Sequence, residues 1–166
     1  MKYRLVKYIG LSFLVLVLIL GTAYVFRTDP VMMISGKHLS GEELTYPENW
    51  LFTNEYQTIK VETNPRNPHS VTTVCFIRDG KLIIPSQEGH TKKWTQNVLE
   101  DNRIRIKVGD NIYPVRLSLI EKDANIKEIG QYLAVKFPDR APPKPDEEPK
   151  NIWLFKVSPR QTILSE

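Results

Sequence analysis

The side chains best suited to chemistry lie in one connection, SQEGHTKKWTQN at residues 86–97, between two stretches that are typical of strands. It places hydroxyl, imidazole and ammonium groups directly before a segment with helical spacing. A phosphate or another anion binds to neutral donors, one or two cations and the free N–H groups at a helix N-terminus. The connection therefore predicts an anion site, with candidate ligands Ser86, His90, Lys92 and Lys93.

A second polar cluster, RNPHS at residues 66–70, precedes the neighbouring predicted strand. If the two strands pair through Asp79-Gly80, this loop and the 86–93 loop emerge at the same end of the hairpin. Together they would present Arg66 and Ser70, with the residues named above, to one anionic group. The alternative is a solvated basic rim.

Two further side chains of the connection have a structural alternative. Trp94 could stack on a planar ring or bury itself against the sheet. Asn97, one helical turn later, could bond to a ligand or to a backbone group at a strand end. Composition alone favours the structural role for both.

Hydrophobic periodicity predicts the elements that position these residues. Alternation over 58–63 is typical of a half-buried strand, and Pro65 and Pro68 end it. Two antiparallel hairpins follow, one over 70–84 around Asp79-Gly80 and one over 103–121. Short helices are predicted over 92–100 and 123–137, the second capped by Asp123. The Pro-rich stretch 141–150 separates them from a last strand at 151–157. We expect a mainly β protein with two or three short helices, in a barrel that closes its strand edges.

The N-terminus departs from globular composition. Residues 8–26 carry no charge and are long enough, as a helix, to cross a hydrocarbon core of about 30 Å. Lys2, Arg4 and Lys7 precede the segment and Arg27 follows it, which predicts a cytoplasmic N-terminus and a periplasmic or extracytoplasmic domain at the cell (inner) membrane. An uncleaved single-pass anchor is favoured over a signal peptide, because Gly21-Thr22-Ala23 is a poor cleavage site. The predicted organisation is a cytoplasmic basic N-terminus over 1–7, a transmembrane anchor over 8–26, a linker leading into the barrel over 27–56, and the barrel over 57–160.

Charge and cysteine usage narrow the function classes. The net charge of +4 comes from the four basic residues in the first 27, because the rest of the chain has as many basic as acidic residues. Nucleic-acid binding is therefore not predicted. The single cysteine, Cys75, is flanked by Val74 and Phe76, which indicates a buried thiol rather than a nucleophile. No metal site is predicted, because the three histidines fall in separate segments.

The stretch from Val71 to Ile120 resembles the split β-barrel family that binds flavin or deazaflavin coenzymes. This family includes pyridoxamine 5'-phosphate oxidase-like proteins and deazaflavin-dependent nitroreductases and quinone reductases. The matched features are a D-G turn at 79–80, a strand ending in Pro85-Ser86, Gly89, a W-x-x-N pattern at Trp94 and Asn97, and a following V-x-V-type strand. The resemblance covers roughly residues 58–120, and NIWLFKV at 151–157 resembles the closing strand. Residues 63–68 keep one arginine but lack the glycine of the R-x-T-G loop of nitroreductases, which leaves the coenzyme open.

The resemblance implies a split β-barrel (FMN-binding-like) whose 86–93 loop and following helix start hold the coenzyme phosphate, beside a strand at 70–76 that runs along the ring. Carried over by position, the cofactor-binding candidates are Ser70, Thr72, Ser86, Lys92, Lys93, Trp94 and Asn97, to which the loop argument adds Arg66. The implied cofactor is FMN or the deazaflavin coenzyme F-420, with haem as the alternative. No catalytic residue is predicted.

Two functions from different classes follow. The first is a membrane-anchored extracytoplasmic oxidoreductase that reduces a quinone or nitro-type acceptor. The second is a non-catalytic split barrel that binds a ligand such as haem, or a partner protein, at the membrane surface. The resemblance also implies a homodimer, in which Trp50 or Trp153 of the second subunit would close the pocket.

Overall fold

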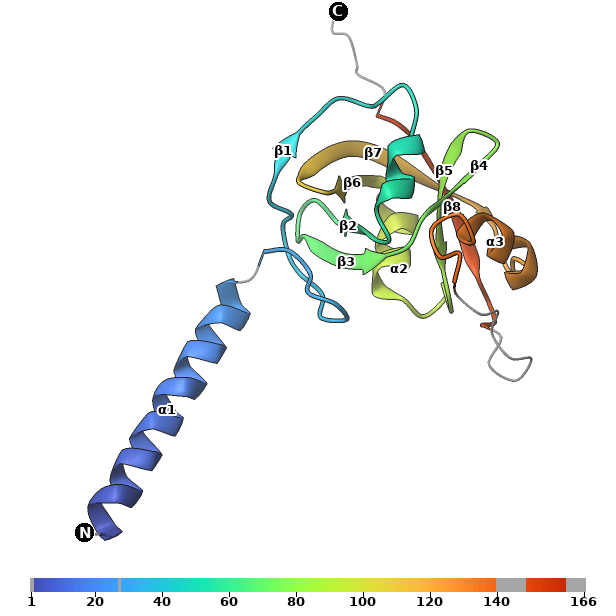
Figure 1. Cartoon of the computed structure of the whole chain (residues 1–166). Helices are drawn as coiled ribbons and strands as arrows, with labels where there is room; N and C mark the ends of the chain where they lie inside the picture. Colours follow the sequence, from blue (N-terminus) through green and yellow to red (C-terminus); the bar gives the residue numbers. More distant parts are fainter. Residues whose placement is uncertain (1, 27, 140–148, 161–166) are drawn as a thin grey trace, which may run out of the picture.

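The structure is a computed structural model that describes residues 2–26, 28–139 and 149–160. It begins with one long helix, α1 (Lys2–Phe26), that extends away from a β-rich domain (Figure 1). The described apolar side chains of α1, from Tyr8 to Leu20, are exposed. A transmembrane anchor is predicted over 8–26, but within the described residues no helix is both long enough and apolar enough to cross a bilayer.

The domain is built on one sheet of antiparallel neighbours in the order β3-β2-β6-β7-β8-β5-β4, with β1 added in parallel beside β7. The elements are, in chain order, β1 (Glu42–Glu43), the 3-10 helix η1 (Leu51–Glu55), β2 (Ile59–Thr63), β3 (His69–Thr73), β4 (Phe76–Arg78), β5 (Lys81–Ser86), α2 (Lys93–Glu100), β6 (Arg103–Val108), β7 (Asn111–Glu121), α3 (Ile126–Leu133) and β8 (Trp153–Pro159). The prediction of a mainly β protein with short helices is confirmed.

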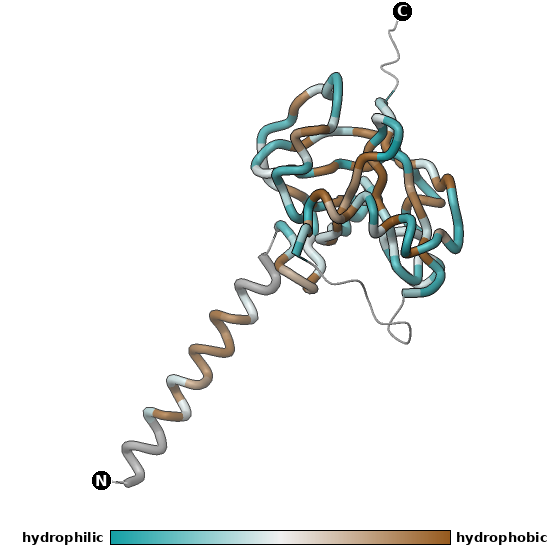
Figure 2. The backbone as a smooth tube through the Cα atoms, turned by 45° about the vertical axis from the view of Figure 1, so that its right-hand side comes forward, coloured by the Kyte–Doolittle hydropathy of each residue, from teal (hydrophilic) through white to brown (hydrophobic). Residues whose placement is uncertain are grey.

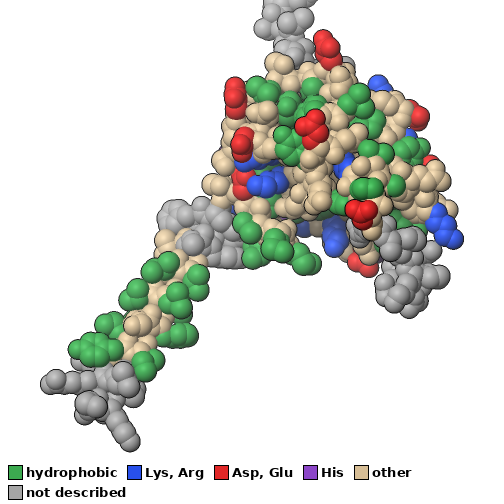
Figure 3. Space-filling view, in the orientation of Figure 1, with side chains coloured by type: hydrophobic (Ala, Val, Ile, Leu, Met, Phe, Trp, Pro, Cys, Tyr) green, Lys and Arg blue, Asp and Glu red, His purple; other side chains and the backbone are tan. Residues whose placement is uncertain are grey.

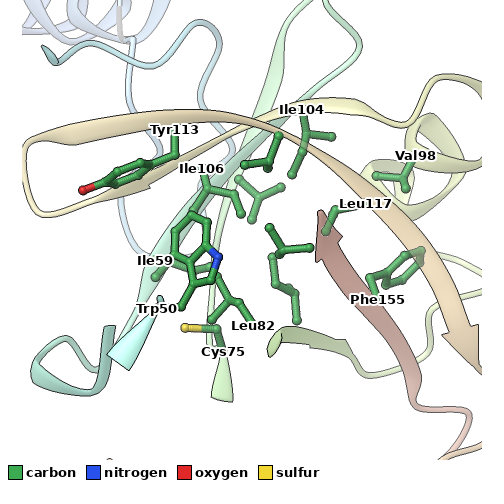
Figure 4. Close-up of a cluster of buried hydrophobic side chains, with 14 of the residues drawn as sticks. Trp50, Ile59, Cys75, Leu82, Val98, Ile104, Ile106, Tyr113, Leu117 and Phe155 are labelled. Carbon is green, nitrogen blue, oxygen red and sulfur yellow. The ribbon is translucent and has the colours of Figure 1, made fainter. Parts of the chain in front are cut away.

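The sheet curls into a half-barrel. Strand β3 lies at one end of the strand order, yet it contacts β5 near the other end, and α2 packs against β2, β3 and β7. The concave side holds the main core, drawn in Figure 4, which includes Trp50, Ile106, Leu117 and Phe155. Alternation along β6 and β7 points every second side chain into this core. Because Trp50 and Trp153 are both buried in the chain's own core, neither is placed to close a second subunit's pocket.

Both predicted hairpin turns form, although the first hairpin pairs only β4 with β5 and not the whole range 70–84. Asp79 and Gly80 both have positive φ, at 51° and 69°, as a two-residue hairpin turn requires, and Arg78 pairs with Lys81. Strands β6 and β7 pair from Arg103 with Arg116 to Val108 with Asn111.

The hairpin predicted over 70–84 requires residues 70–78 to form one strand, and this part of the prediction is wrong. The structure divides these residues at Val74-Cys75 into β3, which pairs with β2, and β4, which pairs with β5. The chain changes partners here because it passes from one end of the half-barrel to the other. Both halves have β-type sequences, so periodicity alone does not reveal the switch.

Helix α3 covers the outer face of the sheet. It lies against β4, and its cluster of buried side chains includes Phe76, Ile129 and Leu154 (Figure 1). The predicted cap, Asp123, is wrong: the helix begins after Asn125, whose side-chain oxygen accepts a hydrogen bond from the Lys127 amide at 2.9 Å. Asp123 instead takes a positive φ of 56° in the preceding turn. Residues 141–148 of the predicted Pro-rich stretch 141–150 lie outside the described residues.

Residues 28–56, predicted as a linker, lie along the domain. A two-residue hairpin joins Val31 to Ile34, Gly36 pairs with Ser70, and β1 pairs with β7. Asp29 binds Lys60 and Lys107 on the sheet, at 2.8 and 2.7 Å. The segment after α1 is therefore fixed to β2, β3 and β6.

Candidate functional site

A cavity of about 340 Å³ lies where the two ends of the half-barrel face each other. Its walls come from β3, the last residues of β5, the start of α2 and the 31–34 hairpin. The lining residues are Met32, Met33, Ile34, Ser35, Val71, Thr72, Thr73, Pro85, Ser86, Gln87, Lys92 and Trp94. The structure thus brings together four predicted site residues: Thr72, Ser86, Lys92 and Trp94.

Three parts of the fold position these four residues: Thr72 lies in β3, Ser86 ends β5, and Lys92 and Trp94 lie at the start of α2. Ser86 is the buried last residue of β5 and pairs with Trp153 of β8. Lys92 is the N-cap residue of α2, and no side chain caps the helix there. Trp94, in the first turn, is largely buried and packs on Phe155 with ring centroids 5.3 Å apart. Trp94 therefore has its structural role, and the part of it that reaches the cavity forms a wall.

The 86–92 loop is fastened on both sides. The Thr95 hydroxyl is within hydrogen-bond distance of the Lys92 carbonyl, at 2.6 Å, and of the Gly89 carbonyl. The Gly89 amide donates to the Asn151 carbonyl at 3.1 Å. A Cβ at Gly89 would lie 2.5 Å from the Trp153 ring, so only glycine fits. These contacts fix the backbone that carries Lys92, and Thr95 is a supporting residue that the sequence analysis missed.

Two predicted residues lie behind the cavity wall. Asn97 is buried, and its side-chain amide donates to the Thr63 hydroxyl at 2.9 Å, which in turn donates to the His69 carbonyl at 3.1 Å. Ser70 is completely buried, and its backbone pairs with Gly36. Its hydroxyl has no hydrogen-bond partner among the described residues. Both residues hold β3 in place rather than line the cavity.

The two remaining predicted cations lie elsewhere. Lys93 is exposed at the start of α2, and its charge adds to the burial that lowers the pKa of His69 below its ordinary value. Arg66 lines a second cavity of about 420 Å³ with Asn64, Glu100, Asp101 and Arg103. There the hydrogen bond from Arg103, at 2.6 Å, lowers the pKa of Asp101 to about 2. The structure therefore does not bring Arg66 to the cavity of Lys92.

The 31–34 hairpin is the part of the lining that the sequence analysis missed. Met32 and Met33 occupy its turn, and both line the cavity with Ile34. The run VMMI was a visible signal, but it fell in a stretch without sustained periodicity. Its position over the cavity depends on long-range pairing of Gly36 with Ser70, which sequence spacing does not show.

The lining side chains are of types that bind a ligand. Among its described lining residues, Lys92 is the sole ionisable side chain. Hydroxyl groups from Thr72, Thr73 and Ser86 lie beside apolar groups from Val71 and the hairpin. Such a cavity suits a ligand with one anionic end and one planar or apolar end.

Comparison with known proteins gives structural likenesses. No family model and no curated protein matches this chain. A candidate pyridoxamine 5'-phosphate oxidase from Listeria innocua is 20% identical, with a TM-score of 0.45 over 66% of this chain and 88% of its own. The haem storage protein HutZ from Vibrio cholerae is 12% identical, with a TM-score of 0.45 over 67% and 87%. An F420-H2 dependent reductase is 20% identical, with a TM-score of 0.41 over 62% and 95%. The chain is similar to these structures over about two thirds of its length.

Proposed function

We propose that this chain is a split β-barrel oxidoreductase that holds a flavin or deazaflavin coenzyme in the cavity between β3 and β5. The observation that carries the proposal is the meeting of Lys92, Ser86 and the start of α2 in one cavity with an apolar wall. A planar coenzyme that carries a phosphate has an anionic end for the Lys92 side of the cavity and a planar end for the apolar wall.

The phosphate end fits the α2 side of the cavity. Lys92 supplies a positive charge, Ser86 a hydroxyl, and the first turn of α2 the positive end of the helix dipole. Because Thr95 and Gly89 fix this backbone, little ordering would be needed on binding.

The ring end fits the β3 side. Val71 and Thr72 would lie along one edge of the ring, while Trp94 and Met33 supply apolar walls. The cavity volume of about 340 Å³ is within the range of small-molecule sites, roughly 300–1,000 Å³.

In this proposal the bound coenzyme supplies hydride or electron transfer to a quinone or nitro-type acceptor. The protein residues bind the phosphate, orient the ring along β3 and exclude water with the apolar wall. Lys92 acts as an electrostatic ligand, and the other described lining residues carry no ionisable side chain.

The proposal includes location and assembly. We propose that α1 attaches the protein to the cell membrane, with the barrel on the extracytoplasmic side, and that the barrels form a homodimer. The exposed apolar side chains of α1 from Tyr8 to Leu20 support the attachment. The Lys and Arg residues that precede them in the sequence favour a cytoplasmic N-terminus.

The test is a set of binding titrations with detergent-purified full-length protein, using FMN, F-420 and haem separately, followed by gel filtration and an absorbance spectrum. We expect retention of FMN or F-420. Lys92→Ala should weaken binding by about tenfold or more, because a charge-assisted contact to the phosphate is lost. Lys81, the exposed first residue of β5, gives the matched control Lys81→Ala, which should bind as the wild type does.

The outcomes separate the two function classes. Retention of haem alone would favour the non-catalytic ligand-binding barrel. Retention of none of the three would remove the coenzyme proposal and leave an interaction module. Equal loss in Lys92→Ala and Lys81→Ala would show that binding follows net charge and not this cavity.

A further inference from the structure

The 31–34 hairpin exposes an unusual amount of apolar surface. All four of its side chains are exposed, and those of Met32 and Met33 are 84% and 100% exposed. Elsewhere in the described domain, exposed large hydrophobic residues occur singly, as with Leu51 or Val135. A contiguous exposed apolar group at the tip of a turn indicates a binding surface.

The base of this hairpin is fixed, so its tip projects in a defined direction. Val31 and Ile34 exchange backbone hydrogen bonds of 3.1 and 2.9 Å. On one side Asp29 binds Lys60 and Lys107, and on the other side Gly36 pairs with Ser70. The apolar tip is therefore held out from the sheet.

The hairpin lies close to α1 along the chain. Val31 is five residues beyond the end of α1, so it can lie at most about 18 Å from that end. Figure 2 shows a hydrophobic segment at the edge of the domain near the end of α1, and Figure 3 shows apolar side chains gathered on that edge. A surface that receives the apolar side chains of α1 would also be within reach of the hairpin.

Positive charge lies beside the apolar tip. Lys92 lines the same cavity as Met32 and Met33, Lys93 follows it with an exposed side chain, and Lys37 is exposed three residues after the hairpin. An apolar tip with a basic rim is complementary to the surface of a bilayer that contains anionic lipids.

We infer that the 31–34 hairpin inserts into the interfacial layer of an anionic lipid bilayer, with Met32 and Met33 as the inserted side chains. The cavity that these residues line then opens at the lipid surface, so a lipid-soluble ligand could reach it without crossing water. This inference rests on the proposed attachment through α1, which holds the domain at the bilayer.

The experiment labels one exposed position at a time in the full-length protein. Met33→Cys carries an environment-sensitive fluorophore at the hairpin tip. Lys81→Cys carries it at the start of β5, beside the β4–β5 turn, which lies on the side of the domain away from α1 (Figure 1). The native Cys75 is fully buried, and labelling of the wild type checks that it does not react. The labelled proteins are reconstituted into phosphatidylcholine–phosphatidylglycerol vesicles, recovered by flotation, and exposed to aqueous iodide or to lipids with a quencher at the level of the upper acyl chain.

The expected result is that both proteins float with the vesicles, that the label at 33 is quenched by the lipid quencher and protected from iodide, and that the label at 81 shows the reverse. Flotation with the label at 33 open to iodide would overturn the inference while leaving the attachment through α1 intact. Protection of that label from both quenchers would show that protein covers the hairpin, which also overturns it. Failure of both proteins to float would remove the attachment and the inference together.

Discussion

At the scale of single residues, the least expected contact is between Lys136 and Cys75. The Lys136 amino nitrogen lies 3.0 Å from the Cys75 sulfur, and the two residues are 7% and 0% exposed. Within the described residues no carboxylate pairs with Lys136. A buried amino group with one weak acceptor is poorly compensated for the water it has lost. The pair should therefore be a weak point of the packing beside α3.

We expect Lys136→Met to stabilise the protein by about 1 kcal/mol, because methionine fills a similar volume without a polar group to desolvate. The free energy of unfolding in urea is the measurement. Lys127→Met, at an exposed position of α3, is the control and should change it by less than about 0.5 kcal/mol. A loss of stability in Lys136→Met would show that the contact with Cys75 makes a net favourable contribution.

The candidate site could be predicted from sequence only in part, and single residues show why. Ser86 and Lys92 were found because hydroxyls and cations before a helix indicate anion binding, and both line the cavity. Asn97 carries the same kind of chemistry but faces Thr63, because the rotation of α2 is fixed by packing. Met32 and Met33 were missed, since no local pattern connects them to β3.

At the scale of elements, the segment that follows α1 is held to the sheet by charge. Asp29 accepts hydrogen bonds from Lys60, Lys107 and the Ser40 amide. Burial raises the pKa of Asp29, but the hydrogen bonds from Lys107 and Lys60 outweigh it, and the pKa lies below its ordinary value. A carboxyl group with a depressed pKa stabilises the folded state above its unfolded pKa, and this stabilisation is lost as the pH falls toward the folded value.

The lowered pKa of Asp29 predicts how the stability of the Asp29→Asn variant, compared with the wild type, depends on pH. The wild type should lose stability as the pH falls below about 4, because Asp29 is then protonated in the unfolded chain before it is in the fold. The variant should be less stable at neutral pH by about 1–2 kcal/mol, since Lys107 loses a partly buried partner. The difference in free energy of unfolding between the two proteins should disappear in acid. Urea unfolding at a series of pH values gives the free energy of unfolding of both proteins. A difference between them that stays constant as the pH falls would contradict this prediction.

The sequence predicted an element well where its hydrophobic residues alternate regularly or where its turn requires particular residue types. The β6 and β7 strands alternate cleanly, and Asp79-Gly80 permits positive φ at both turn positions. The division of 70–78 into β3 and β4 was missed because it follows from closure of the half-barrel, a property of the whole sheet.

At the scale of the whole molecule, the described residues form two apolar clusters of unequal size on opposite faces of the sheet. The larger cluster fills the half-barrel with side chains from β2, β5, β6, β7 and β8. The smaller one lies under α3 and includes Phe76, Ile129 and Leu154. Strand β4 is an edge strand that pairs only with β5 among the described strands. The α3 side should therefore open more easily than the barrel.

Native-state hydrogen exchange tests this order of opening. Amides of β7, which lies between β6 and β8, should exchange only through global unfolding, so their exchange should rise steeply with urea. Amides in the first turns of α3, such as that of Ile129, which bonds to the Asn125 carbonyl, should exchange through a smaller opening with a shallow urea dependence. Lys136→Met should slow exchange in α3 and leave β7 changed only by the gain in global stability. If α3 and β7 exchange with the same free energy and the same urea dependence, the two clusters unfold as one unit, and the weakness assigned to the Lys136 contact is not local to α3.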